Sequence, residues 1–139
     1  MSEMNSVKLF TVEEANRLLP KIEKMIADLR RQRDLILSQE VEIDALELVT
    51  QKKGPEVPPV LSQKIEAYHQ TADNFYKAID KIEELGCLLK DLDMGLIDFY
   101  TRYEGRVVHL CWHTGEKEIT TWHEIGKGYA HRQPINPGK

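Results

Sequence analysis

Residues 60–86, VLSQKIEAYHQTADNFYKAIDKIEELG, hold the strongest periodic pattern in the chain and decide the fold of its first half. Apolar residues recur there at alternating spacings of four and three: Leu61, Ile65, Tyr68, Ala72, Phe75, Ile79 and Ile82. This spacing places them on one face of an α-helix, and glycine is the usual residue just after a helix end. We therefore predict a helix over residues 60–85 that stops at Gly86.

The glycines divide the chain into two parts. All eight lie at or after Gly54, and seven of them fall between Gly86 and Gly138. Glycine costs about 1 kcal/mol in a helix interior relative to alanine and is favoured in turns. Gly86 therefore marks the boundary between a helical first part and a turn-rich second part. Residues 51–59 contain Gly54 and three prolines, so we predict a linker there.

A second long helix is predicted over residues 11–50. The Thr11 hydroxyl can accept a hydrogen bond from the backbone of Glu14 while the Glu14 carboxylate accepts one from the backbone of Thr11. Pro20 lacks a backbone donor and clashes with the carbonyl four residues earlier, so we expect a kink or a break near Leu19. Beyond it, apolar residues repeat every seven positions, as in a coiled coil, with two glutamines between them. The repeat is Ile22, Leu29, Ile36 and Ile43, and the glutamines are Gln32 and Gln39.

The first helix also carries a second apolar row, rotated by about 100° from the first at 3.6 residues per turn. The row comprises Leu19, Ile26, Leu37, Val41 and Leu48. A single partner helix cannot bury both rows. We expect a homodimer that buries the second row between two copies, so that four helices pack together. The alternative is that the C-terminal sheet of the same chain folds back over the row.

Short runs of strand-forming residues alternate with turn residues after Gly86. They predict three to four short antiparallel strands over residues 87–125, followed by an irregular tail over residues 126–139 that is disordered after Ile135. The last two strands, 106–112 and 118–125, are expected to form a hairpin with its turn at Gly115. The fold class is therefore α+β: a long antiparallel helical hairpin, its first helix kinked near Pro20, followed by a small antiparallel sheet. We expect residues 1–139 to form a single domain.

Composition excludes several classes of function. The 139 residues carry a formal net charge of −4, so the chain lacks the sequence-independent attraction to phosphate on which most nucleic-acid binding depends. No apolar run is long enough to span a membrane, and no N-terminal signal segment is present, which with only two cysteines predicts a cytoplasmic, reduced protein. No phosphate loop, dinucleotide fingerprint or nucleophile elbow occurs, so whether the protein is an enzyme stays open.

Three residue types that bind metals alternate along one expected strand. His109, Cys111 and His113 point to the same face of that strand, and His123 lies on the next one. Such residues could bind zinc or another divalent metal. Pairing of His113 with Glu118 would put His123 on the opposite face from Cys111, whereas pairing of His109 with His123 would form a cluster. The sequence leaves both registers open, and Cys111 could also be a plain buried residue.

Six further residues mark a candidate ligand or partner surface on the sheet. Tryptophan often lines binding surfaces, but in a sheet this small it equally forms the core. Carboxylates near the Gly95 turn could hold a metal or act in acid–base chemistry, or simply be solvated, and an arginine could clamp an anion or anchor the tail. The six residues are Trp112, Trp122, Asp91, Asp98, Arg106 and Arg132.

The chain resembles a bacterial and archaeal family known as domain-of-unknown-function family 2203. The motifs that carry the resemblance are Phe10-Thr11, Glu13-Glu14-Ala15-Asn16, Leu18-Leu19-Pro20, Gly86, Lys90-Asp91, Gly95-Leu96-Ile97-Asp98-Phe99, Leu110-Cys111-Trp112, Gly115-Glu116, Trp122-His123 and Arg132-Gln133-Pro134. Two positions depart from the family's pattern, in which a basic residue usually stands at His113 and a proline often stands at Tyr100. The resemblance implies no established activity, so it assigns no role to these residues.

We predict from these observations a dimeric interaction or ligand-binding module with a tryptophan, cysteine and histidine surface on its C-terminal sheet. Its partner protein or small ligand is not identified by the sequence. The alternative is a metal-binding protein or metal-dependent enzyme that uses Cys111 and His123, with His109 or a nearby carboxylate as a further ligand and zinc as the candidate cofactor.

Overall fold

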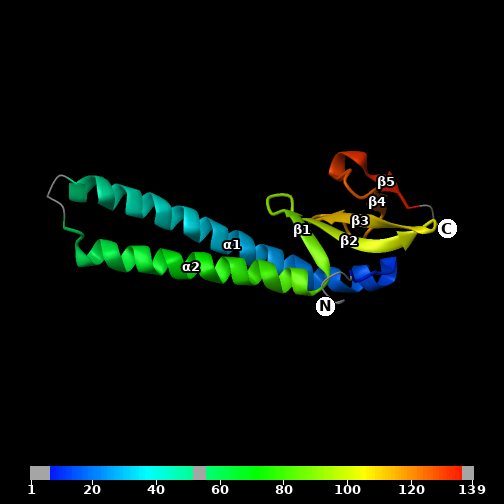
Figure 1. Ribbon diagram of the computed structural model, residues 1–139, viewed down its shortest axis with the longest axis horizontal. Coiled ribbons are helices and arrows are strands. Elements are labelled where there is room, and N and C mark those ends of the chain that lie inside the picture. Colours follow the sequence, from blue (N-terminus) through cyan, green and yellow to red (C-terminus); the bar gives the residue numbers. More distant parts are fainter. Residues whose placement is uncertain (1–6, 52–55, 136–139) are drawn as a thin grey trace. The chain divides into compact units, whose positions relative to one another are not determined.

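The computed structural model describes residues 7–51 and 56–135 and has the α+β fold expected from the sequence (Figure 1). Two helices precede a five-stranded antiparallel sheet in the order β1-β2-β3-β4-β5. The elements are α1 (Val12–Gln51), α2 (Pro59–Glu84), β1 (Cys87–Asp91), β2 (Leu96–Tyr103), β3 (Arg106–His113), β4 (Thr121–His123), the short 3-10 helix η2 (Tyr129–His131) and β5 (Gln133–Pro134). Among the described residues, no helix is both long enough and apolar enough to cross a membrane.

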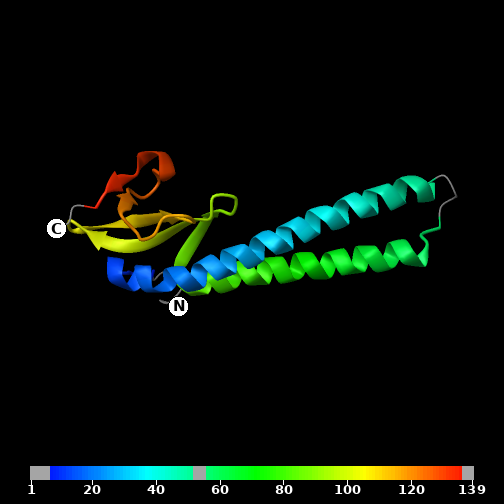
Figure 2. The same cartoon turned by 180° about the vertical axis from the view of Figure 1, so that it is seen from behind.

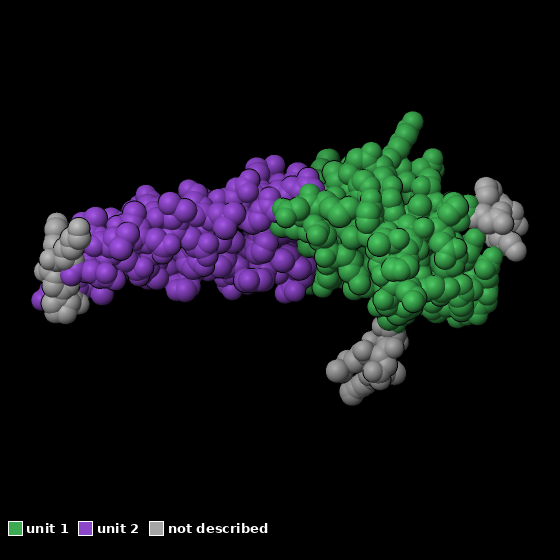
Figure 3. All heavy atoms as spheres, turned by 90° about the horizontal axis from the view of Figure 1, so that it is seen from above, with its two compact units in different colours: residues 1–26, 81–139 green, residues 27–80 purple. Residues whose placement is uncertain are grey.

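The chain divides into two compact units, which Figure 3 draws in green and purple. Unit 1 comprises residues 1–26 and 81–139, and unit 2 comprises residues 27–80. Unit 1 holds the first turns of α1, the last turn of α2 and the whole sheet, whereas unit 2 holds the long facing parts of the two helices.

Helix α1 begins with the capping box that its sequence predicts. The Thr11 backbone N–H donates to Glu14 Oε1 over 2.9 Å, and the Glu14 N–H donates to Thr11 Oγ1 over 3.0 Å. The helix runs without interruption past Pro20, so of the kink or break expected near Leu19 the break does not occur. Pro20 removes only one intrahelical hydrogen bond, and a long helix with a strong cap tolerates that loss.

In unit 2, α1 and α2 lie antiparallel. The Tyr68 hydroxyl donates to Glu40 Oε2 over 2.7 Å, and Lys64 Nζ lies 3.2 Å from Glu42 Oε2, so contacts move backward along α2 as they move forward along α1. The seam is partly polar, as the heptad pattern predicts. The side-chain oxygens of Gln32 and Gln39 are buried there, and neither has a hydrogen-bond partner among the described residues. The linker expected over residues 51–59 falls partly on residues 52–55, which lie outside the described residues.

In unit 1 the sheet separates the start of α1 from the C-terminal segment, as both ribbon views show (Figures 1 and 2). On the α1 side, the rings of Phe10 and Phe99 meet edge to face with centroids 5.1 Å apart, and Thr101 Oγ1 donates to the Phe10 carbonyl over 2.6 Å. Gly86 lies between α2 and β1 beside the Phe10 ring, and this position requires glycine. Its φ is +104°, and a Cβ placed there would come within 3.0 Å of the Phe10 ring.

The C-terminal part differs from the sequence prediction in two respects. The strand expected over residues 118–125 is only Thr121–His123. The chain lies outside the sheet at buried Ile119, because the backbone N–H of Ile119 donates to Asn16 Oδ1 over 2.8 Å. The tail expected to be irregular contains η2 and β5, and β5 pairs with β4, so the sheet has five strands rather than three to four. The residues after Ile135 lie outside the described residues.

The second apolar row of α1 has two halves with different surroundings. Leu19 and Ile26, in unit 1, are 5% and 0% exposed. Leu37, Val41 and Leu48, in unit 2, are 52%, 70% and 65% exposed. The chain itself therefore covers the first half of the row and leaves the second half on the surface.

Candidate metal centre

Three strands bring potential metal ligands to the same face of the sheet. Asp98 on β2 pairs with Cys111 on β3, and His109 on β3 pairs with His123 on β4. Side chains alternate along a strand, so all four residues point to one face, away from α1. Of the two registers that the sequence left open, the structure has the one that forms the cluster.

The ligand atoms of Asp98, Cys111 and His123 converge. One ligand atom from each residue lies within 4.8 Å of those of the other two, and the three residues are 2%, 0% and 1% exposed. Metal–ligand bonds of about 2.0–2.3 Å place the ligands of a tetrahedral zinc ion roughly 3.3–3.8 Å apart. A small movement of side chains would therefore close these three residues around an ion.

The hydrogen bonds of His123 indicate what its ring can do. Nδ1 lies 2.9 Å from the carbonyl oxygen of Glu124, to which a protonated Nδ1 donates. In that tautomer the lone pair of Nε2 faces Asp98 Oδ2, only 3.1 Å away. Two acceptor atoms this close need a proton or a cation between them. In metal sites, the histidine nitrogen that does not bind the ion usually donates to a backbone carbonyl or a carboxylate, as Nδ1 of His123 does in this tautomer.

The opposite tautomer has support of its own. The backbone N–H of Gly128 lies 3.2 Å from Nδ1 and donates to it when Nδ1 is unprotonated. Nε2 of His123 then carries the proton and donates to Asp98 Oδ2. The metal-free cluster can therefore satisfy this one contact by a hydrogen bond.

Other polar atoms of the cluster have no partner. Asp98 Oδ1 and both ring nitrogens of His109 are buried and make no hydrogen bond among the described residues. His109 Nδ1 lies 3.5 Å from Asp98 Oδ2, and its ring packs against the rings of Tyr100 and His123. Burial lowers the pKa of His109, against the raising effect of Asp98, which favours a neutral ring with a free lone pair. At the rim, Lys90 Nζ lies 3.8 Å from Asp98 Oδ2.

The thiol of Cys111 is not an activated nucleophile in this setting. Burial, and then the nearby Asp98 carboxylate, raise its pKa to about 12. A cysteine nucleophile reacts as the thiolate, which requires a lowered pKa. The cysteine, histidine and aspartate together thus do not lower the thiol pKa as nucleophilic catalysis requires. A metal cation bound to the sulfur would instead cause the thiol to lose its proton.

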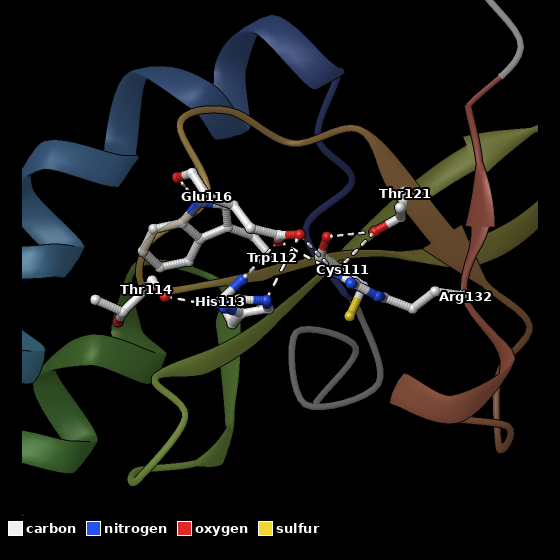
Figure 4. A network of polar contacts seen from close by, with 7 residues as sticks. All are labelled: Cys111, Trp112, His113, Thr114, Glu116, Thr121 and Arg132. Atoms are coloured by element: carbon white, nitrogen blue, oxygen red, sulfur yellow. Dashed lines mark hydrogen bonds and ion pairs between the residues drawn. The ribbon is translucent and has the colours of Figure 1, made fainter.

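Arg132 anchors the C-terminal segment to the sheet (Figure 4). Its Nη1 lies 3.0 and 3.1 Å from the two carboxylate oxygens of Glu116 and 3.3 Å from Thr121 Oγ1, and its guanidinium stacks on the Tyr129 ring at 4.3 Å. Glu116 also accepts from the His113 backbone N–H over 3.1 Å. The guanidinium of Arg132 is therefore held by contacts within the protein, as expected if this arginine anchors the tail rather than clamping an anion.

The remaining residues of the candidate surface lie apart from the cluster. Trp112 and Trp122 are 0% and 5% exposed, so they form core and neither offers an exposed binding surface. Arg106 forms an ion pair with Glu124 and lies over the Trp122 ring. Asp91 Oδ1 accepts from the Met94 backbone N–H over 2.9 Å, which closes the turn before Gly95.

Sequence reasoning placed Asp98 among the turn carboxylates and did not join it to Cys111. The signal was present in the turn that follows β2. Glu104 and Gly105 both have positive φ, 53° and 83°, as a two-residue hairpin turn requires. Such a turn pairs Tyr103 with Arg106, and counting back along both strands pairs Asp98 with Cys111.

Comparison with known proteins gives a family and no activity. A family model described as "Uncharacterized conserved protein (DUF2203)" matches residues 8–135, which is most of the chain. No curated protein and no solved structure matches the chain.

Proposed function

We propose that this chain, which belongs to the DUF2203 family, binds one divalent transition-metal ion, with zinc as the first candidate. The description of the family assigns no activity, so the proposal comes from the candidate site. The proposed ligands are Asp98, Cys111 and His123. The observation that carries the proposal is the convergence of their ligand atoms, from three strands, within 4.8 Å in a fully buried setting. A set of one sulfur, one nitrogen and one oxygen ligand suits zinc in its tetrahedral sites.

His109 is our candidate for the fourth ligand. It is 4% exposed, its ring nitrogens have no hydrogen-bond partner among the described residues, and Nδ1 lies 3.5 Å from Asp98 Oδ2. A rotation of its ring would bring a nitrogen toward the other three ligand atoms. Four protein ligands in a buried site are typical of structural zinc, whereas catalytic zinc keeps an open position. We therefore favour a structural role, in which the ion ties β2, β3 and β4 together.

Elemental analysis of protein purified without an affinity tag tests the proposal. We expect about one zinc or similar ion per chain, and loss of that ion in Cys111→Ser, Asp98→Asn and His123→Gln. Cys87→Ser is the matched control, because Cys87 is the other buried free cysteine and has no proposed metal role. A chain without metal that also fails to bind added zinc would refute the proposal, as would a Cys111→Ser variant that binds as well as the parent protein.

The sequence adds expectations about the origin and the location of the protein. A bacterial or archaeal origin follows only from the family resemblance. Both cysteines are free, which is consistent with the expected cytoplasmic, reducing location. An interaction module remains the second candidate function, because the exposed half of the α1 row still calls for a partner.

A further inference from the structure

Unit 2 presents an apolar surface that nothing in the described chain covers. We define the Leu37 face as the side of α1 that carries Leu37, Val41 and Leu48, which are 52%, 70% and 65% exposed. Their spacings of four and seven residues place them on one side of the helix. Large apolar side chains in such a row mark an interaction surface more often than scattered single ones do.

A groove of about 400 Å³ runs beside this row, between α1 and α2. Ile43, Ile65 and Tyr68 form its apolar lining. Carboxylates of α1 border it: Glu40, Asp44 and Glu47. An occupant therefore needs apolar side chains flanked by positive charge.

The same side of α1 carries positive charge of this kind in its earlier part. Arg30 and Arg33 precede Leu37 by seven and four residues, so they lie on the Leu37 face, while Asp44 follows it by seven. The face thus begins with two basic residues, continues with Leu37 and Val41, and then carries Asp44 before it ends at Leu48. Arg33 Nε already lies 3.5 Å from Asp34 Oδ1. Their side chains are 31% and 71% exposed, so this partly exposed pair can exchange partners at little cost.

We propose that the Leu37 face docks on the Leu37 face of a second copy of this chain, with the two α1 helices antiparallel. The antiparallel orientation sets Arg30 and Arg33 of each copy against Asp44 and Glu47 of the other. A parallel orientation would oppose like charges along the whole helix. Self-complementary contacts of this kind are what a two-fold dimer uses.

The available area is sufficient for a dimer. Some 20 residues of helix are about 30 Å long. The Leu37 face together with the groove beside it, which α2 lines with Ile65 and Tyr68, is roughly 20 Å wide, so a contact that covers both occupies about 600 Å² on each copy. Both copies together would then bury about 1,200 Å², which is the lower end of specific, stable interfaces.

Sedimentation equilibrium of the full chain between about 1 and 100 μM tests the proposal. We expect a dimer that Leu37→Glu and Val41→Glu convert to a monomer with unchanged helix content by circular dichroism. Leu35→Glu and Val49→Glu are matched controls, since both residues are exposed on the other side of α1 and should leave the dimer intact. A parent protein that stays monomeric at 100 μM would overturn the proposal, and so would a dimer that survives Val41→Glu.

A charge swap tests the pairing. A basic variant, Asp44→Arg with Glu47→Arg, and an acidic variant, Arg30→Glu with Arg33→Glu, should each lose self-association at least tenfold. Mixed in equal amounts, the two should form a heterodimer as strong as the parent dimer. Failure of the mixture to associate would refute the charge pairing.

Engineered cysteines test the orientation. Leu48→Cys should not crosslink to itself across an antiparallel dimer, because position 48 lies far from the two-fold axis. It would crosslink readily in a parallel dimer, which would refute the antiparallel arrangement. The parent protein is the control, since Cys87 and Cys111 are buried.

Discussion

Removal of metal from unit 1 is the most direct test of the candidate centre, and its effect on stability can be worked out from the site. Without an ion, Asp98 Oδ1 and the two ring nitrogens of His109 are buried with no hydrogen-bond partner among the described residues. Each buried, unsatisfied polar group costs about 1–3 kcal/mol. An ion that satisfies even one of them recovers a measurable part of the free energy of unfolding.

Mass action sets the size of the effect. Zinc at 100 times its dissociation constant adds about 2.7 kcal/mol to the free energy of unfolding. For a chain of 139 residues, with an unfolding entropy of about 2.1 cal/mol/K per residue, the total entropy is about 0.29 kcal/mol/K. The midpoint of thermal unfolding should therefore rise by about 9 °C when zinc is added to chelator-treated protein.

Tryptophan fluorescence is a suitable assay, because both tryptophans lie in unit 1 and are buried there. Melting curves would compare chelator-treated protein with and without zinc, with magnesium as the control ion. Cys111→Ser should show no zinc-dependent shift. The reasoning fails if saturating zinc moves the midpoint of the parent protein by less than about 1 °C, or if it stabilises Cys111→Ser equally.

Four further changes have expected outcomes. Gln39→Leu should raise the free energy of unfolding of the helical hairpin by about 1 kcal/mol in urea titrations, because it removes a buried oxygen without a described partner; a destabilised variant would contradict this. Gly86→Ala should lower stability by about 1–3 kcal/mol, since φ is +104° and the Cβ meets an aromatic ring; equal stability would show that the junction relaxes. Arg132→Ala should speed limited proteolysis of the C-terminal segment, because the ion pair with Glu116 is lost, and an unchanged cleavage rate would argue against anchoring. Burial raises the pKa of the Cys87 thiol from 9.0 to about 11, so the folded state keeps a proton that the unfolded chain loses. Stability should therefore fall as the pH rises from 9 towards 11, and Cys87→Ala should reduce that slope in urea titrations at pH 8 and 10.5.

Sequence reasoning worked best where the signal is local. The apolar period of α2 and its end before Gly86 predicted the helix to within one residue, because helix period and glycine cost depend only on near neighbours. The cap at Thr11 is likewise a contact across three residues. Of the kink or break expected near Leu19, the break does not occur, because the local cost of Pro20 is outweighed by the packing of a long helix.

The candidate site was harder to predict, because it depends on strand register. The two-residue turn at Glu104 and Gly105 could have paired Asp98 with Cys111. The register of β4 had no such guide, because the connection from His113 to Thr121 leaves the sheet. Its position depends on Asn16, whose side chain accepts from the Ile119 backbone N–H from more than one hundred residues away in the sequence.

Taken alone, the amino-acid order determined two long helices, the place where helix gives way to strand, and the alternation of His109, Cys111 and His113, because each follows from near neighbours along the backbone. Only the tertiary structure decided that Asp98, Cys111 and His123 meet, and that Leu19 is covered while Val41 is not. The physical reason is that register and coverage depend on contacts between distant segments, whose positions the local sequence does not encode.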